Sequence, residues 1–368
     1  MNLALSARTL GTLLLLPALS FSQQPVADHP TGPKTESSDI ATLRSSAANG
    51  DAVAERKLAE AYHQGNGVDQ SDPLAANFYR KAADQGDAEA QNRLGVMFSL
   101  GRGMQKSKED AVLWYRASAK QGYALAMFNL GAAYYNGDGV PSDLRLAYAW
   151  FLLSQEAGNS AAKDAVTRTA QELKPIATAD SLEDVGAMYL KGDEVPRNPS
   201  AGLRWYNEAA KQSDSAKMAL ANILAAGKTV PLDFPGAMKL CRQAANDRFA
   251  AGDYCVGLLY EKEFGVEKNL NEAAKWYELA AAGIIPRIRA RAYLQLGDIY
   301  SMGEGMSIDR VEASYFFIQA YAAGASEAKT KYQALWPMLS HDESKKLERK
   351  LRDRRLDPKK VFSMMQSQ

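Results

Sequence analysis

Two serine–lysine pairs are the residues whose types and spacing could do chemistry in this sequence. Ser160 with Lys163 and Ser326 with Lys329 have the SxxK spacing of penicillin-recognising enzymes, which use the serine as a nucleophile. Both pairs stand at one phase, in GNSAAK and GASEAK, just after a glycine that is expected to end a helix. Because no SDN or KTG triplet accompanies them, we interpret both as the ordinary composition of a helix start.

The histidines and cysteines lack the spacing of a metal site. His29, His63 and His341 lie far apart, and neither Cys241 nor Cys255 belongs to a CxxC motif. We therefore expect no metal, no other cofactor and no catalytic residue, and we expect His63 to lie on the surface.

A glycine-rich stretch, NGDGVPSD at residues 136–143, is a further place where a ligand could bind. A phosphate-binding loop would need the lysine of GxxxxGK[ST], which is absent here. A calcium loop of the EF-hand kind would need an acidic residue where Tyr134 stands. The stretch is therefore interpreted as a chain reversal, in which glycine adopts positive φ without a steric penalty.

Copies of this stretch recur along the chain. GNGV, GRGM and GDGV begin at residues 65, 101 and 137, which is a spacing of 36 residues. A fourth full copy, GEGM, stands at 303–306, and weaker copies fill the gap at 192–195, 227–230 and 263–266. A catalytic loop is needed once, whereas seven copies at one phase are typical of a repeat array.

Each copy lies between two predicted helices, because the apolar residues recur at spacings of three and four. A Leu-Gly or Val-Gly pair usually precedes the turn, and the glycine is expected where a neighbouring ring comes close. Two large residues follow each turn: Phe78-Tyr79, Trp114-Tyr115, Trp150-Phe151, Trp205-Tyr206, Leu240-Cys241, Trp276-Tyr277 and Phe316-Phe317. We expect these rings to be buried, and Trp114→Ala to cost about 3–5 kcal/mol.

The pattern A-x-x-x-L-G-x-x-Y-x-x-G-x-G-V, followed by A-x-x-W-Y-x-x-A-A-x-x-G, resembles the Sel-1-like repeat family of tetratricopeptide-type solenoids. The copy at residues 126–158 matches almost throughout, and the resemblance extends over about residues 47–325. It implies an all-α fold: a right-handed α-solenoid of helix-turn-helix repeats, each of about 36 residues, with a concave groove.

The same resemblance implies a non-enzymatic protein–protein interaction scaffold. Similar proteins act as adaptors in envelope signalling, secretion or polysaccharide-export assemblies, or in host interaction. A glycan- or peptidoglycan-binding structural protein of the envelope is one alternative. A hydrolase acting on β-lactams, like some cysteine-rich relatives, is another, although no nucleophile constellation supports it.

The array is interrupted where successive turns stand 55 residues apart. Residues 160–173 predict an unpaired helix, and residues 174–181 predict a helix-breaking segment (a breaker) after it. A smaller insertion falls near residues 284–290. We expect a signal peptide at 1–22, a disordered linker at 23–38, a first array at 39–174, a second array at 180–340 meeting it at a bend, and a basic C-terminal capping helix and tail at 341–368.

The net charge and the N-terminal segment limit which partners and which cellular location are expected. With 44 basic and 43 acidic residues, the net charge of +1 points neither to nucleic acid nor to a membrane surface. Arg8 and the short apolar run after it predict export, so we expect a bacterial periplasmic or secreted protein, or alternatively one of the eukaryotic endoplasmic-reticulum lumen. We expect a monomer without a membrane span that binds a protein partner. The basic stretch at 345–360 is interpreted as the solvated face of a cap, with Leu347, Leu351 and Leu356 facing inward.

A row of variable residues on the first helices is the candidate partner surface. The position before the Leu-Gly pair, or before the two residues that stand in its place, holds Lys57, Arg93, Asn129, Asp184, Ala219, Cys255 and Gln295. We take Lys57, Arg93, Asn129, Asp184 and Gln295 as candidate contacts, and ordinary solvent-facing variation is the alternative interpretation.

A disulfide between Cys241 and Cys255 stays open at this point. The two cysteines flank a turn near residue 247, so antiparallel packing could bring them together, and an exported protein permits the bond. Cys255, however, occupies the variable position, which suggests that the two side chains point apart.

Overall fold

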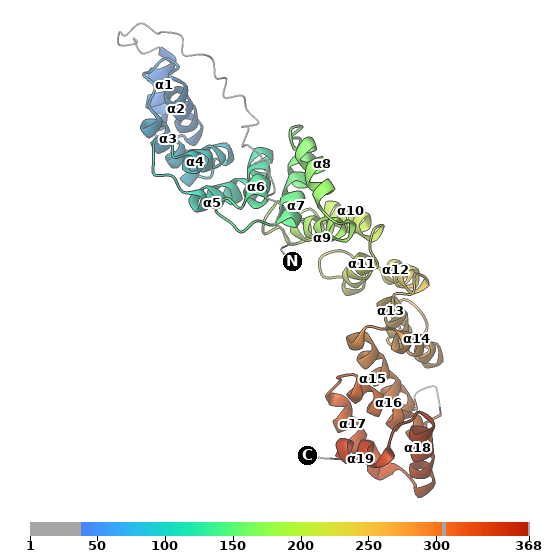
Figure 1. Cartoon of the computed structure of the whole chain (residues 1–368). Helices are drawn as coiled ribbons and strands as arrows, with labels where there is room; N and C mark the ends of the chain where they lie inside the picture. The colour runs from blue at the N-terminus through green and yellow to red at the C-terminus, as the bar shows by residue number, and fades with distance from the viewer. Residues whose placement is uncertain (1–37, 304–306, 367–368) are drawn as a thin grey trace, which may run out of the picture. The chain divides into compact units, whose positions relative to one another are not determined.

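The structure, a computed structural model, describes residues 38–303 and 307–366 (Figure 1). The predicted signal peptide, residues 23–37 of the predicted linker and residues 304–306 of the last glycine copy lie outside the described residues. Within the described residues the chain folds as helices without strands, which confirms the all-α prediction. It forms two compact units, one ending at Ala209 and the other beginning at Ala210.

The first unit consists of consecutive helices joined by short turns. They are α1 (Ser38–Ala48), α2 (Ala52–Gln64), α3 (Asp72–Asp84), α4 (Ala88–Leu100), α5 (Lys108–Ala119), α6 (Ala124–Asn136), α7 (Leu144–Glu156), α8 (Ala162–Glu172), α9 (Pro175–Lys191) and α10 (Pro199–Ala210), the last of which reaches the boundary.

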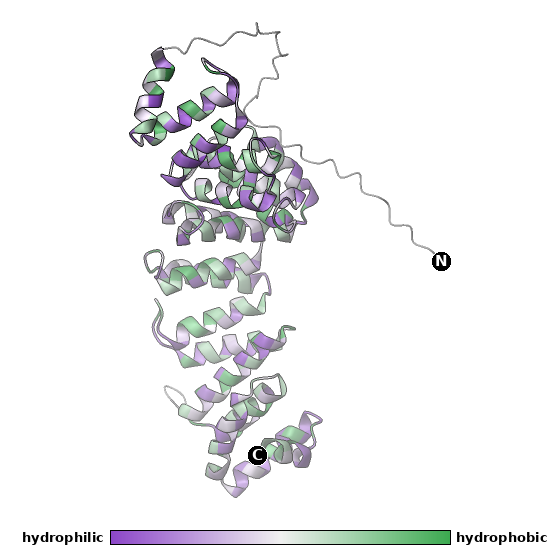
Figure 2. Cartoon of the chain, turned by 90° about the vertical axis from the view of Figure 1, so that its left-hand side faces the viewer, coloured by the Kyte–Doolittle hydropathy of each residue, from purple (hydrophilic) through white to green (hydrophobic). Residues whose placement is uncertain are grey.

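The second unit continues in the same way. Its helices are α11 (Asp214–Ala226), α12 (Phe234–Asn246), α13 (Ala250–Glu261), α14 (Leu270–Ala282), α15 (Pro286–Met302), α16 (Arg310–Ala322), α17 (Glu327–Leu335), the 3₁₀ turn η1 (Trp336–Met338), α18 (His341–Asp353) and α19 (Pro358–Gln366). Hydrophobic and hydrophilic residues are interspersed along the helices (Figure 2), as expected for helices that bury part of their surface against their neighbours.

The repeated glycines act as turn residues, as the sequence predicts. In the stretch NGDGVPSD at residues 136–143, Gly137 adopts φ +75° as the C-terminal cap of α6, and Gly139 adopts φ +72° two residues later. Asp143 then begins α7, because its side chain accepts hydrogen bonds from the backbone N–H groups of Arg145 and Leu146. The stretch is therefore a helix stop followed by a helix start.

The second glycine of the turn is also a point of contact with the preceding repeat. A Cβ atom on Gly139 would lie 2.3 Å from the carbonyl oxygen of Lys108, which is the first residue of α5. A Cβ atom on Gly137 would meet nothing closer than 3.5 Å. The neighbouring residue Asp138 forms an ion pair with the Lys108 ammonium group. The second glycines Gly103 and Gly265 likewise lie against the first residues of α3 and α12.

Gly139→Ala is therefore expected to destabilise the protein more than Gly137→Ala does. Both substitutions place a side chain at similar positive φ, but only the first forces a methyl group into backbone atoms that cannot move away cheaply. The difference should be about 1–3 kcal/mol, the usual cost of overpacking. Urea denaturation of the two variants measures it, and equal midpoints would contradict the contact.

In the repeats that have this glycine on the first helix, the second ring after the turn covers it, as predicted. A Cβ atom on Gly131 would lie 2.6 Å from the Phe151 ring, and one on Gly95 would lie 2.7 Å from the Tyr115 ring. The same relation holds for Gly186 with Tyr206, Gly257 with Tyr277 and Gly297 with Phe317. The glycine lets the two helices of a repeat approach closely enough to bury the ring.

The first ring of each pair is buried less uniformly than predicted. Trp150 is 2% exposed, whereas Trp114 is only half-buried and lies beside Arg80. The second ring is buried in both repeats, at Tyr115 and at Phe151. The full loss of stability predicted for Trp114→Ala is therefore expected for Trp150→Ala instead.

The break in the array is a complete extra helix. As predicted, α8 lacks a repeat partner, and α7 packs against both α8 and α9 (Figure 1). The predicted breaker at 174–181 is wrong, because α9 begins at Pro175 and continues through those residues. Proline is well tolerated at the first helical position, where its missing N–H is not needed. The predicted arrays 39–174 and 180–340 with a bend between them stay a prediction.

Two first helices are longer than the others. Both α9 and α15 have 17 residues, whereas α2, α4, α6 and α11 have 13. The four extra residues make about one helical turn. The insertion predicted near residues 284–290 is therefore absorbed at the start of α15, and its apolar face keeps its direction.

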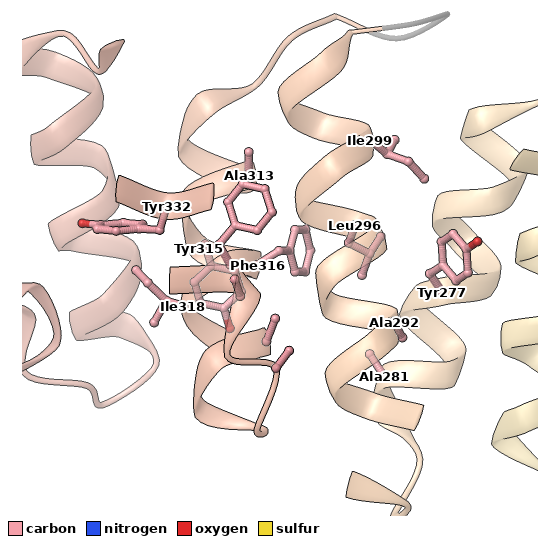
Figure 3. Packing of buried hydrophobic residues seen from close by; sticks show 14 of the residues in the cluster. Tyr277, Ala281, Ala292, Leu296, Ile299, Ala313, Tyr315, Phe316, Ile318 and Tyr332 are labelled. Carbon is pink, nitrogen blue, oxygen red and sulfur yellow. The ribbon is translucent and has the colours of Figure 1, made fainter. Parts of the chain in front are cut away.

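The C-terminal helices close the core of the second unit. In Figure 3, Tyr277, Leu296, Phe316 and Tyr332 lie between successive helices, from α14 to α17. Leu347 and Leu351 of α18 are fully buried in the same cluster, and Leu356 packs partly against it, which confirms the inward-facing leucines. A further helix, α19, follows where the sequence predicts a tail, and Met365 is buried there.

Candidate functional site

The serine–lysine pairs lie at helix starts, as the sequence interpretation expects. Ser160 and Lys163 are exposed around the beginning of α8, and Ser326 precedes α17 directly. In both pairs the lysine backbone N–H donates to the serine carbonyl oxygen, at 3.3 and 3.2 Å. This is the hydrogen bonding of a first helical turn and positions no nucleophile.

The expectation of a surface histidine at position 63 is wrong. His63 is 8% exposed at the end of α2, and its Nδ1 lies 2.8 Å from a carboxylate oxygen of Asp72. The space beside this pair measures ≈ 10 Å³ and is lined by Tyr79, Arg93 and Met97 among others. That volume is about one water molecule, so the histidine–aspartate pair joins α2 to α3 and has no room for a substrate.

The part of the chain that the structure describes was compared with the requirements of a metal cluster and of a membrane-spanning helix. Across residues 38–303 and 307–366, no three or more His, Cys, Asp or Glu side chains gather where they could hold a metal ion. Among these same residues, no helix combines the length and the apolar character that crossing a bilayer demands.

The predicted row of first-helix residues is only partly open to solvent. Lys57 on α2 is exposed, and within the described residues its ammonium group has no carboxylate partner. Asn129 on α6 donates to the side-chain oxygen of Asn92 on α4, at 2.9 Å. Neighbouring first helices are thus joined through polar side chains along this face.

Arg93 belongs to an ionic network between α2 and α4. Its guanidinium lies 3.7 Å from Glu89 and 4.0 Å from Glu60. Arg56 pairs with Glu89 at 2.8 Å and with Asp87 at 3.0 Å. Because the side chains of Arg56 and Arg93 are only 20% and 15% exposed, the network holds the charges of this face in place.

Asp184 is likewise paired, on α9. Arg145 of α7 lies 3.3 Å from Asp184 and 3.4 Å from Asp180. Burial raises the pKa of Asp184, and the arginine partly opposes that rise. This member of the row therefore binds α9 to α7 and is not a free contact.

Gln295 lines a hollow in the second unit. The hollow has a volume of ≈ 560 Å³ and lies between the end of α13 and the second half of α15. Its charged lining includes Glu261 and Asp298, and Asp298 is bonded to Lys331 at 2.5 Å. Acidic and basic groups alternate there, so the hollow has no single charge to offer a ligand.

The two cysteines are joined by a disulfide in the structure. Cys241 of α12 and Cys255 of α13 have Cα atoms 5.7 Å apart. The expected divergence of their side chains is therefore wrong. Cys241 is fully buried among Met238, Val256 and Leu259, whereas Cys255 is half-buried.

This disulfide stands where the repeated ring is missing. Cys241 occupies the position of the buried ring, and Ala221 replaces the glycine that the ring would cover. The bond therefore fixes α12, in the repeat whose own aromatic contact is absent, to α13, the first helix of the next repeat.

An arginine stripe on α1, α3 and α5 escaped the sequence interpretation. Arg44, Arg80 and Arg116 are spaced by 36 residues, and each lies over the ring eighteen residues further on. The distances from Cζ to the ring centres are 6.0 Å at Tyr62, 5.2 Å at Phe98 and 6.0 Å at Tyr134. The repeat spacing was the signal that could have found it.

Asp253 makes the folding stability of the second unit depend on pH. Its side chain, on α13, is half-buried, and burial raises the pKa of the carboxyl group from 3.8 to about 6. The folded state thus binds the proton more tightly than the unfolded state does. The stability gained this way is complete below pH 3.8 and is lost as the pH rises through about 6.

Asp253→Asn is accordingly expected to raise the melting temperature at pH 7, and the gain should shrink as the pH falls to 4. Thermal melts across this range measure the difference, and a gain independent of pH would contradict the assignment. Asp247→Asn is the matched control of opposite sign. Hydrogen bonding from Lys217 lowers the pKa of Asp247, so that variant should be the less stable one at pH 7.

These features define an all-helical repeat protein whose described side chains are arranged for packing and surface contact. The Sel1 repeat family matches the chain at residues 52–87, 88–123, 124–159, 179–214, 215–247, 251–283 and 290–324. The chain therefore belongs to the Sel1 repeat family, which confirms the resemblance. Each matched segment begins near a first helix, and α8 falls between the third and fourth segments.

Several solved structures are similar to this chain. A Sel1 repeat protein from Oxalobacter formigenes has 22% sequence identity and a TM-score of 0.39, with 81% of this chain and 80% of that chain covered. A protective antigen of uropathogenic Escherichia coli strains with an SLR fold has 21% identity and a TM-score of 0.30, with 89% and 97% covered. The comparison with curated proteins returned no match.

Proposed function

We propose that this chain is an exported, non-enzymatic scaffold for protein–protein interaction in a bacterial envelope, where it acts as an adaptor in the periplasm or after secretion. The repeat family supports a binding role, since repeats of this kind present extended surfaces rather than a reaction site. The predicted signal peptide supports export. A scaffold of the eukaryotic endoplasmic-reticulum lumen is the alternative location.

The observation that carries the proposal is the exposed charge of Lys57 beside the fixed network of α2 and α4. An ordered charge pattern next to an uncommitted cation can select a partner by electrostatic complementarity. Arg93, Asn129, Asp184 and Gln295 extend the proposed contact row, although the first three also serve the fold.

Affinity capture tests the proposal. Protein beginning at residue 23 would be crosslinked in envelope extract, and captured proteins would be identified by mass spectrometry. Lys57→Glu is the decisive variant, because it reverses a charge without breaking a pair. Lys120→Glu, at the exposed end of α5, is the matched control.

A single dominant protein that is lost with Lys57→Glu and kept with Lys120→Glu would support the scaffold and its row. Retention on isolated sacculi without any enriched protein would instead favour the peptidoglycan-binding alternative. Turnover of nitrocefin by the purified protein would favour the hydrolase and contradict a non-enzymatic role.

A further inference from the structure

An open hollow of ≈ 550 Å³ lies on the first unit beside the arginine stripe. It is lined by Arg80, Phe98, Asp110, Leu113, Trp114 and Ala117, which come from α3, α4 and α5. None of these residues belongs to the proposed first-helix row. The hollow is therefore a separate surface of the same unit.

Arg80 differs from its counterparts at the same repeat position. Arg44 donates to the Tyr62 hydroxyl at 2.8 Å, and Arg242 donates to the Tyr260 hydroxyl at 2.9 Å. The residue that faces Arg80 is Phe98, which has no hydroxyl group. In the described part of the chain, the Arg80 guanidinium consequently has neither a hydrogen-bond acceptor nor an ion-pair partner.

The guanidinium is held in place nonetheless. It lies 5.2 Å from the centre of the Phe98 ring and 5.8 Å from that of Trp114, both within cation–π range. Its planar fork of N–H donors is thus preorganised on an aromatic support and is exposed to solvent. That fork matches a carboxylate, which it can bind in a bidentate manner.

The rest of the hollow adds an apolar group and an acceptor. Leu113 is 63% exposed and leaves an aliphatic surface next to Trp114. Asp110 is exposed and lies outside ion-pair distance of Arg80, so its carboxylate remains available to accept from an N–H group. The hollow therefore combines a cation, an aliphatic surface and an anion.

We propose that this hollow is a docking site for a short extended peptide segment of a protein partner, in which an acidic side chain stands next to an aliphatic one. The acidic side chain binds Arg80, the aliphatic side chain packs on Leu113 and Trp114, and a backbone N–H of the segment donates to Asp110. This inference rests on the proposed scaffold function and adds the chemistry of one partner.

A peptide suits the hollow better than a sugar does. Sugars stack on the exposed face of an aromatic ring, but here Arg80 lies over the rings of both Phe98 and Trp114. An acidic peptide uses that guanidinium instead of competing with it. Arginine and tryptophan are also the residues most enriched among the strongest contacts of protein interfaces.

Panning a phage-displayed library of random heptapeptides on the purified protein tests the site. Enriched peptides should share an acidic residue beside an aliphatic one. By fluorescence anisotropy, Arg80→Ala should weaken their binding about tenfold or more, which is what losing a charge-assisted hydrogen bond implies. Replacing the acidic residue of the peptide with its amide should weaken binding to the same extent.

Two further variants separate docking from folding and from net charge. Phe98→Tyr restores the hydroxyl found at Tyr62, Tyr134 and Tyr260, and it should weaken binding by giving Arg80 an internal acceptor. Arg242→Ala removes an arginine at the same repeat position in the second unit, and it should leave binding unchanged.

Absence of an enriched motif, or peptides that bind Arg80→Ala as well as the unchanged protein, would overturn the docking site. If affinity capture still returned a partner that depends on Lys57, the proposed function would stand without this site. Peptides that require Arg80, together with no captured protein, would support the site and contradict the envelope scaffold.

Discussion

Replacing Trp150 with alanine is expected to lower the free energy of unfolding of the first unit by about 3–5 kcal/mol. Trp150 is 2% exposed, and it stands beside Phe151, which is fully buried over Gly131. Removing the indole leaves a cavity that the close contact of α6 with α7 cannot easily fill. Repeat arrays draw stability from neighbouring contacts, so the loss should extend to α8 and α9, which also pack on α7.

Trp114→Ala is the matched control for this prediction, because it removes the same side chain at the same repeat position. Trp114 is half-buried, so the expected cost is only about 1–2 kcal/mol. Urea denaturation followed by far-UV circular dichroism compares the two variants. Equal midpoints for both would show that burial does not decide the effect.

Loss of the disulfide has the second large expected effect. Cys241 and Cys255 are 14 residues apart, and closing a loop of that size stabilises a fold by about 3 kcal/mol in the chain-entropy account. The double variant Cys241→Ala with Cys255→Ala should therefore unfold at lower urea than the oxidised protein. The effect should be large because this repeat lacks the ring that stabilises its neighbours.

Reduction supplies the control. With dithiothreitol present, the unchanged protein and the double variant should unfold at similar urea concentrations. Thiol titration of the protein denatured without reductant should find no free thiol. Two reactive thiols in that titration would contradict the bond.

The repeated contacts were predictable because they recur. The glycines at 95 and 131 and the rings at 115 and 151 are spaced identically, so one correct interpretation applies to every copy. The positions of the turns then follow from local residue types, since glycine accepts positive φ and aspartate caps the following helix.

Single, long-range contacts were not predictable in the same way. Whether His63 is buried depends on Asp72 of the next helix, and whether Cys255 meets Cys241 depends on how α13 is rotated against α12. Sequence spacing fixes neither rotation nor side-chain direction. In the candidate row, the charges of Arg93 and Asp184 are evident from the sequence, but the residues of the same chain that pair with them are not.

The breaker expected at 174–181 failed for a different reason. Proline and small polar residues read as a loop, yet Pro175 stands where a helix can begin and α9 then packs on α7. Tertiary packing overrides a weak local preference of this kind.

The 17-residue first helices restrict how this kind of chain can change length. An insertion of four residues turns a helix by about 400°, which returns its apolar stripe almost to the same direction. An insertion of two would turn it by about 200° and would point the stripe at solvent. Both α9 and α15 carry the tolerated number. Indels in the first helices of such an array should therefore come in whole turns, and any other length should be confined to the loops or should add an entire helix, as α8 does.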